Sequence, residues 1–109
     1  MADTATLELK EKTDNGHCRL ELVGWMDSSN SYLLEEWLEA NLNKGHRRIT
    51  FCCRGLEFIS SAGIRVFLAA LRHIGMLDDC ELRFANIGAS VMGVLTVTGL
   101  DKLITQAES

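Results

Sequence analysis

The stretch Leu56–Leu71, LEFISSAGIRVFLAAL, joins a strand-like run to an amphipathic helix through two serines and two small residues. The apolar residues after the serines repeat at intervals of three and four, the spacing of one helical face: Ile64, Phe67, Leu68, Leu71 and Ile74. We therefore expect a helix that ends near Gly75. One of the serines can cap it by accepting a hydrogen bond from a free amide of the first turn. The same helix end stabilises negative charge, which makes a serine there a candidate for phosphorylation.

The run before this stretch, Ile49–Cys53 (ITFCC), is continuously apolar and has the length of a strand. Such a run suits a central strand that is covered on both faces. We expect the strand to end at Arg54-Gly55, which leaves 55–61 as a loop. Functional sites in open sheets gather beyond the carboxyl ends of the strands, so this loop is the first place to look for one.

Two segments near the N-terminus alternate between apolar and polar residues, with Leu7, Leu9, Cys18, Leu20 and Leu22 on the apolar side. Between them, Asp14-Asn15-Gly16 predicts a tight turn and hence an antiparallel hairpin. The next helix has Leu34, Trp37, Leu38 and Leu42 at helical spacing, and it should end at Gly45. Four polar residues before it can accept hydrogen bonds from its first amides: Asp27, Ser28, Ser29 and Asn30.

The remainder of the chain predicts a fourth strand, in which Cys80, Leu82 and Phe84 alternate with charged residues, and a helix over 89–104. One face of that helix would carry Val91, Val94, Leu95 and Thr98. The predicted order is β-β-α-β-α-β-α. Because strand-helix-strand units make parallel neighbours, we expect an α/β fold in which helices pack against a mixed sheet. A chain of 109 residues fits a single domain over 1–109.

Composition limits the classes of function. No apolar run approaches the roughly eighteen residues of a membrane span, and the N-terminus lacks the features of a signal peptide, so we expect a cytoplasmic protein without membrane insertion. A net charge of -4 argues against nucleic acid as a partner. The one basic cluster, His46–Arg48, is expected in a solvated loop. The cysteines form no CxxC pair and should be buried, reduced thiols: Cys18, Cys52, Cys53 and Cys80.

Patterns typical of enzymes are missing from the sequence. The three histidines have no ligand spacing, and neither GxxxxGK nor GxGxxG occurs. Glu57 lies near the serines, but a carboxylate alone activates serine poorly. We therefore predict a protein that is not an enzyme, with no catalytic residue, no metal and no cofactor of its own.

The opening stretch resembles the central signature of STAS domains, the family of bacterial anti-sigma factor antagonists and of the cytoplasmic tails of sulfate transporters. The common form is a phenylalanine and an aliphatic residue, then Asp-Ser-Ser/Thr-Gly-Leu and an apolar helix. Three further segments resemble family motifs in the same order: LVGWMDSSNS, GHRRITF and VLTVTGLDKLI. Together the four cover essentially the whole chain.

The resemblance implies particular roles for residues. Ser61 falls on the serine that antagonists of the family carry as their phosphorylation site, with Ser60 as the second choice. Asp27 matches an acidic residue that lies near that site in the family fold. Ser60 stands where the motif has Asp, and Cys52 replaces a polar residue. The implied partner-binding face comprises Asp27, Ser28, Ser29, Asn30, Ser60, Ser61, Ala62, Gly63 and Arg65.

The implied function is that of an anti-sigma factor antagonist. It would sequester an anti-sigma factor that is also a GHKL-type serine kinase and so release a sigma factor; a PP2C-type phosphatase would reset Ser61. The alternative is a STAS scaffold or sensor module that binds a signalling or transporter partner without phosphorylation. The replaced Asp favours the alternative, whereas the intact Ser61 favours the antagonist. A binder of small molecules is a third, more distant reading.

Overall fold

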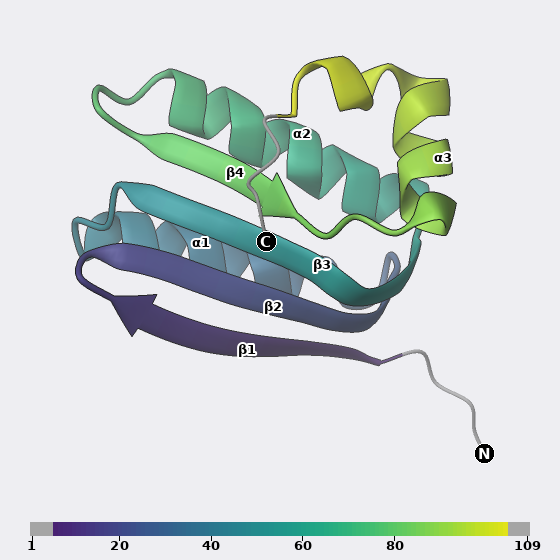
Figure 1. Ribbon diagram of the computed structural model, residues 1–109, viewed down its shortest axis with the longest axis horizontal. Coiled ribbons are helices and arrows are strands. Elements are labelled where there is room, and N and C mark those ends of the chain that lie inside the picture. The colour runs from purple at the N-terminus through teal and green to yellow at the C-terminus, as the bar shows by residue number, and fades with distance from the viewer. Residues whose placement is uncertain (1–5, 105–109) are drawn as a thin grey trace.

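The computed structural model describes residues 6–104, which form one sheet, three α-helices and a short 3₁₀ helix (Figure 1). The elements follow in the order β1 (Leu7–Asp14), β2 (His17–Met26), α1 (Tyr32–Asn43), β3 (Arg48–Ile59), α2 (Ser61–Gly75), β4 (Glu81–Ala85), α3 (Ala89–Thr98) and η1 (Leu100–Lys102). The sheet order is β1-β2-β3-β4; β1 is antiparallel to β2, and the other neighbours are parallel. The predicted α/β fold with a mixed sheet is confirmed.

The hairpin forms where its turn residues predict it. Asn15 and Gly16 both have positive φ, 50° and 79°, the combination that a type I′ turn requires. Asp14 and His17 face each other directly across this turn, and the antiparallel ladder continues to the pair Leu7 and Gly24. The turn therefore sets the register of the whole hairpin.

Helices α1 and α2 lie on one face of the sheet (Figure 1). Aromatic rings fill the centre of the core on that side. Phe51 of β3 lies with its ring centroid 5.5 Å from that of Phe84 and 6.2 Å from that of Phe67. The Phe67 and Phe84 centroids are 5.0 Å apart, and all three side chains are fully buried. Edge-to-face and tilted pairs at these distances add to the stabilisation that burial itself provides.

The central strand is longer than predicted. It does not end at Arg54-Gly55 but continues to Ile59, so the expected loop over 55–61 is wrong. The reason is that β2 also continues, to Met26, and pairs with the extension after two register shifts. Such irregularities increase the local twist and change the direction of side chains. An alternating pattern of apolar and polar residues does not reveal them.

The predicted third helix is too long. α3 ends at Thr98, because Gly99 adopts a left-handed conformation (φ 81°) and the chain turns into η1. Val91 and Leu95 are buried, as the predicted face requires. Thr98 is exposed, and its hydroxyl donates a hydrogen bond to the carbonyl of Leu95 at 3.0 Å. The positive φ at Gly99 ends this helix as a C-terminal cap does.

The basic cluster is not simply a solvated loop. Arg47 is half-buried and donates from one guanidinium nitrogen to the carbonyls of Leu42 (3.1 Å) and His46 (2.9 Å). The Leu42 carbonyl also accepts from the Gly45 amide at 3.0 Å, so Arg47 adds a second bond at the end of α1.

The four cysteines are free thiols, and three of them are buried as predicted; Cys80 is only half-buried. Desolvation raises the pKa of Cys53 to about 12, so this thiol stays protonated in the core. Within residues 6–104, no helix is long and apolar enough to cross a membrane.

Replacing Phe67 with alanine tests the aromatic centre of the core. We expect the free energy of unfolding to fall by about 3–5 kcal/mol, because the change leaves a cavity among fully buried rings. Urea unfolding followed by circular dichroism measures this loss. Leu68 is the neighbouring control: it is only half-buried, so Leu68→Ala should cost less. Equal losses for the two variants would contradict this description of the core.

Candidate functional site

The candidate site lies where β2 and β3 end side by side. Met26 and Ile59, the last residues of these parallel strands, are register partners, and the Ser60 amide donates to the Met26 carbonyl at 2.8 Å. The segments 27–30 and 60–65 therefore leave the sheet from adjacent points. The predicted residues that are far apart in the sequence are brought together at one end of the sheet.

Ser60 caps α2, and Ser61 is the first residue of the helix. Ser60 has extended backbone angles, and its Oγ accepts a hydrogen bond from the Gly63 amide at 3.4 Å. Ser61 is exposed, and its hydroxyl makes no hydrogen bond within residues 6–104. The first turn of α2 holds no acidic residue, so no side chain of its own neutralises the positive end of the helix.

Gly63 allows the start of α2 to approach the ends of both strands. A Cβ atom at this position would lie 2.7 Å from Cγ1 of Ile59 and 2.9 Å from Sδ of Met26, closer than such atoms can come. The glycine is buried in this contact. Its role at the site is thus to set the position of Ser61 relative to the strands.

The segment Asp27–Asn30 forms a turn of its own and does not cap α1 as predicted. The Asp27 carboxylate accepts from the Ser29 amide (2.9 Å) and the Ser29 hydroxyl (2.7 Å), and these bonds hold the pKa of Asp27 below its ordinary value. α1 starts only at Tyr32, after Ser31, whose side chain makes no capping bond. Asp27 therefore places a fixed negative charge at the end of β2.

Asn30 holds this turn to the strand that precedes it. Its side-chain oxygen accepts from the Asp27 amide and its side-chain nitrogen donates to the Trp25 carbonyl, both at 2.9 Å. Asn30 is buried, so its predicted contact with a partner would be indirect. Of the predicted partner-binding residues, those that are exposed are Ser28, Ser29, Ser61 and Arg65.

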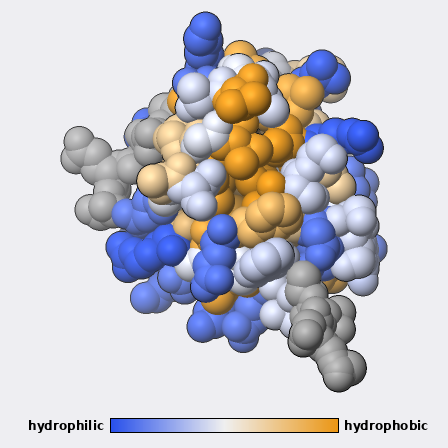
Figure 2. Space-filling model, turned by 90° about the vertical axis from the view of Figure 1, so that its right-hand side faces the viewer, coloured by the Kyte–Doolittle hydropathy of each residue, from blue (hydrophilic) through white to orange (hydrophobic). Residues whose placement is uncertain are grey.

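An exposed aromatic pair adjoins the site and was missed from the sequence. Trp25 and Phe58 are register partners at the ends of β2 and β3, with ring centroids 4.8 Å apart and exposures of 47% and 40%. Apolar side chains reach the surface at this end of the molecule (Figure 2). The signal in the sequence was that each ring precedes a core residue, Met26 or Ile59, and so should point out of the core.

The described residues offer no cluster of three or more His, Cys, Asp or Glu side chains that could hold a metal ion. The site consists instead of hydroxyls, one carboxylate, free helix amides and two exposed rings. Such a surface suits contact with another protein better than chemistry on a bound substrate.

Comparison with known families agrees with this geometry. The family model described as the STAS domain matches residues 8–109. The chain belongs to the STAS domain family. A Bordetella bronchiseptica protein named as the anti-sigma factor antagonist BtrV is 32% identical over 88 residues, which cover 81% of this chain and 75% of the relative. The prediction of a protein that is not an enzyme agrees with this relative.

Solved structures share the fold of this STAS domain. An anti-sigma factor antagonist from Mycobacterium paratuberculosis superposes with a TM-score of 0.79 at 17% identity, covering 91% of this chain and 83% of the other. The anti-sigma factor antagonist SpoIIAA, in its unphosphorylated form, gives a TM-score of 0.77 at 17% identity, with coverage of 92% and 88%. At these identities the likeness concerns the fold alone.

Replacing Gly63 with alanine tests the close approach at the site. The new methyl group has no room between Ile59 and Met26, so we expect a loss of about 1–3 kcal/mol in the free energy of unfolding. The matched control is Gly93→Ala in α3, where a Cβ would meet no atom within 4 Å. That change should stabilise the STAS domain by about 0.5–1 kcal/mol, as alanine does inside helices. Thermal unfolding of the two variants measures both changes in stability. An unchanged stability of Gly63→Ala would contradict the close contact described for Gly63.

Proposed function

We propose that this STAS domain is an anti-sigma factor antagonist whose binding to an anti-sigma factor is switched off by phosphorylation of Ser61. The observation that carries the proposal is the position of Ser61. Its hydroxyl is exposed and unbonded within the described residues, at the start of a helix fixed beside segment 27–30 by the bond between Ser60 and Met26. A kinase can reach such a hydroxyl without unfolding the chain.

The two serines have different roles. The Ser60 hydroxyl already accepts the Gly63 amide as the helix cap, which is also what the aspartate of the family motif could do. Ser61 makes no comparable bond and is free to receive a phosphate. Ser60 remains the second choice, because it is half-buried and engaged in the cap.

A phosphate on Ser61 can be held by the protein's own surface. It adds about -1.5 to -2 charges at neutral pH, which the free amides and positive end of α2 stabilise. Arg65 is exposed and lies four residues further along the helix, the spacing at which helical side chains interact. The modified domain should therefore stay folded.

The same phosphate would oppose binding. A partner that covers Trp25 and Phe58 must remove water from this end of the molecule, and a doubly charged group next to an apolar interface loses its hydration without a matching gain. The fixed negative charge of Asp27 adds repulsion. Phosphorylation therefore leads to release of the partner and not to unfolding of this domain.

The partner we infer is an anti-sigma factor of the GHKL kinase type, which phosphorylates Ser61 with its own ATP, and a PP2C-type phosphatase resets the site. The name of the Bordetella relative supports an anti-sigma factor as the partner, and the description of SpoIIAA as unphosphorylated supports phosphorylation as the control. The pathway places the protein in the cytoplasm, where sigma factors act.

Variants of the two serines test the switch. Ser61→Ala should bind the kinase constitutively and take up no phosphate, and Ser61→Asp should bind at least tenfold more weakly, by about 1.4 kcal/mol or more. Ser60→Ala is the matched control: it should still be phosphorylated, with a loss of about 0.5–2 kcal/mol in stability because a cap is removed. The assay incubates each protein with the GHKL kinases of the same genome and ATP, and phosphopeptide mass spectrometry locates the label.

A label on Ser60 would overturn the assignment of Ser61. If no kinase labels either serine while one of them still binds the domain, the unphosphorylated scaffold replaces the switch.

Alanine variants of the aromatic pair test the partner face. Trp25→Ala and Phe58→Ala should each weaken kinase binding by about 2 kcal/mol or more, the range of interface anchors, while unfolding changes by at most about 1.5 kcal/mol. Arg65→Glu should also weaken binding without loss of stability. Met76→Ala, at the far end of α2 and 79% exposed, is the control that should leave binding unchanged. Calorimetric titration gives the affinities. Equal affinities of Met76→Ala and Trp25→Ala for the kinase would show that the rings do not belong to the interface.

A further inference from the structure

The face of the sheet opposite α1 and α2 contains a hollow lined mainly by cations. It has a volume of about 340 Å³ and is formed by residues of β1, β2 and β3: Lys10, Glu11, Lys12, Arg19, Glu21, Cys52 and Arg54. The small, buried Cys52 lies between longer side chains of the neighbouring strands. The hollow is therefore a consequence of a short side chain in the middle of the sheet.

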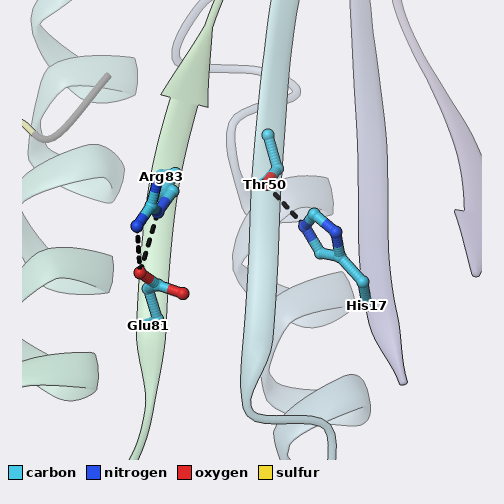
Figure 3. Close-up of polar contacts among 4 residues, drawn as sticks. All are labelled: His17, Thr50, Glu81 and Arg83. Carbon is cyan, nitrogen blue, oxygen red and sulfur yellow. Dashed lines mark hydrogen bonds and ion pairs between the residues drawn. The ribbon is translucent and has the colours of Figure 1, made fainter. Parts of the chain in front are cut away.

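Few negative charges balance these cations. The Glu11 carboxylate is engaged by the Trp37 indole N–H of α1 at 2.8 Å, which draws it toward the opposite face of the sheet. Glu21 is then the one carboxylate that accompanies the four cations. The only ion pair within residues 6–104 joins Arg83 to Glu81, with N and O atoms 2.7 Å apart, and lies on the neighbouring strand β4 (Figure 3).

The polar groups next to the hollow are hydrogen-bonded to one another. His17 Nε2 and Thr50 Oγ1 are 2.7 Å apart and hydrogen-bond to each other across β2 and β3 (Figure 3). Arg83 is held by two contacts to Glu81, 2.7 and 2.8 Å long. None of these groups compensates the charge of Lys10, Lys12, Arg19 or Arg54.

The register gives the hollow one favourable pair, because Lys10 faces Glu21 across the antiparallel ladder, and one costly pair. Lys12 and Arg19 face each other directly across the antiparallel ladder, and like charges in such a pair destabilise a sheet. Four of the chain's 11 lysine and arginine residues line this hollow, although the net charge of the chain is -4. A stability cost without an internal benefit is typical of a surface used for binding.

We propose that this open face binds an acidic, extended segment of a partner protein, with Asp or Glu at alternate positions. Lys10 and Lys12 lie two residues apart on one strand, about 6.8 Å, which matches the spacing of alternate side chains on an extended segment. Arg19 and Arg54 reach the same hollow from β2 and β3. This inference concerns a different surface from Ser61 and does not depend on the proposed phosphorylation.

A protein segment fits better than nucleic acid. Glu21 lies among the cations and would repel a phosphate backbone, whereas a carboxylate-bearing peptide can place an amide or hydroxyl opposite it. Four cations are also fewer than the phosphate contacts of most nucleic-acid interfaces, which lose affinity steeply with salt.

The experiment uses the full chain and a labelled octapeptide that alternates glutamate and threonine, with a peptide that has glutamine in place of glutamate as its neutral match. Fluorescence anisotropy at roughly physiological salt, where the screening length is about 8 Å, measures the affinity. We expect the acidic peptide to bind and the neutral one not to bind. Amide shifts in an NMR titration should fall on β1, β2 and β3.

Lys12→Glu is the decisive variant. It should weaken peptide binding at least tenfold and raise the melting temperature, because the repulsion with Arg19 becomes an attraction. Arg72→Glu, an exposed change of equal charge on α2, should alter the affinity less than twofold.

The proposal is overturned by any of several results. One is equal weakening by both variants, which would indicate a general effect of net charge. Another is a higher melting temperature with unchanged affinity, which would mean that the lysines only protect the edge strand β1 from pairing with other chains. Tighter binding of a single-stranded oligonucleotide of equal charge, or no binding of the acidic peptide, would also reject it.

Discussion

The hydrogen bond from the Ser60 amide to the Met26 carbonyl closes the parallel pairing of β2 and β3, and the position of every site residue depends on that pairing. Met26 and Ile59 are buried register partners next to it. A slip of one residue would turn both side chains to solvent and bring Trp25 and Phe58 into the core, so the buried face specifies the register strongly. The same pairing that fills the core thus fixes the turn over Asp27–Asn30 beside the start of α2.

The surface of the domain is divided into regions of different chemistry. The carboxyl end of the parallel strands has hydroxyls, free helix amides and a pair of exposed rings, which suits contact with another protein. The open face of the sheet has a concentration of cations. α1 contributes glutamates to a third region, a groove of about 260 Å³ between α1 and α2. A small domain can in this way present separate surfaces without a second core.

The sequence predicted what local chemistry determines. The hairpin follows from two residues that tolerate positive φ, and the helices follow from apolar residues at three- and four-residue spacing. Ser60 as a cap follows from its place before such a helix. The general location of the site could also be predicted, because parallel strands bring their carboxyl ends to one edge.

Features that depend on the path of the backbone in the folded chain were not predicted. The continuation of β3 to Ile59 requires two register shifts against β2, and these shifts also pair Trp25 with Phe58. Asn30 was expected to cap a helix, but the carbonyl of Trp25 and the amide of Asp27 are better placed to bind it. The role of Arg47 depends on where α1 ends in space. In each case the path of the folded backbone decided between alternatives that the sequence pattern left equal.

The parallel arrangement of β2 and β3 has a consequence for when the site exists. Parallel neighbours cannot be joined by a tight turn, so these strands meet only when the chain between them, including α1, has crossed back along the sheet. A newly synthesised or unfolded chain carries Ser61 but not its junction with Asp27. An enzyme that contacts both segments therefore distinguishes the folded domain from an unfolded chain that carries the same serine. Under the proposed switch, an unfolded chain would neither receive the phosphate nor bind a partner that contacts both segments.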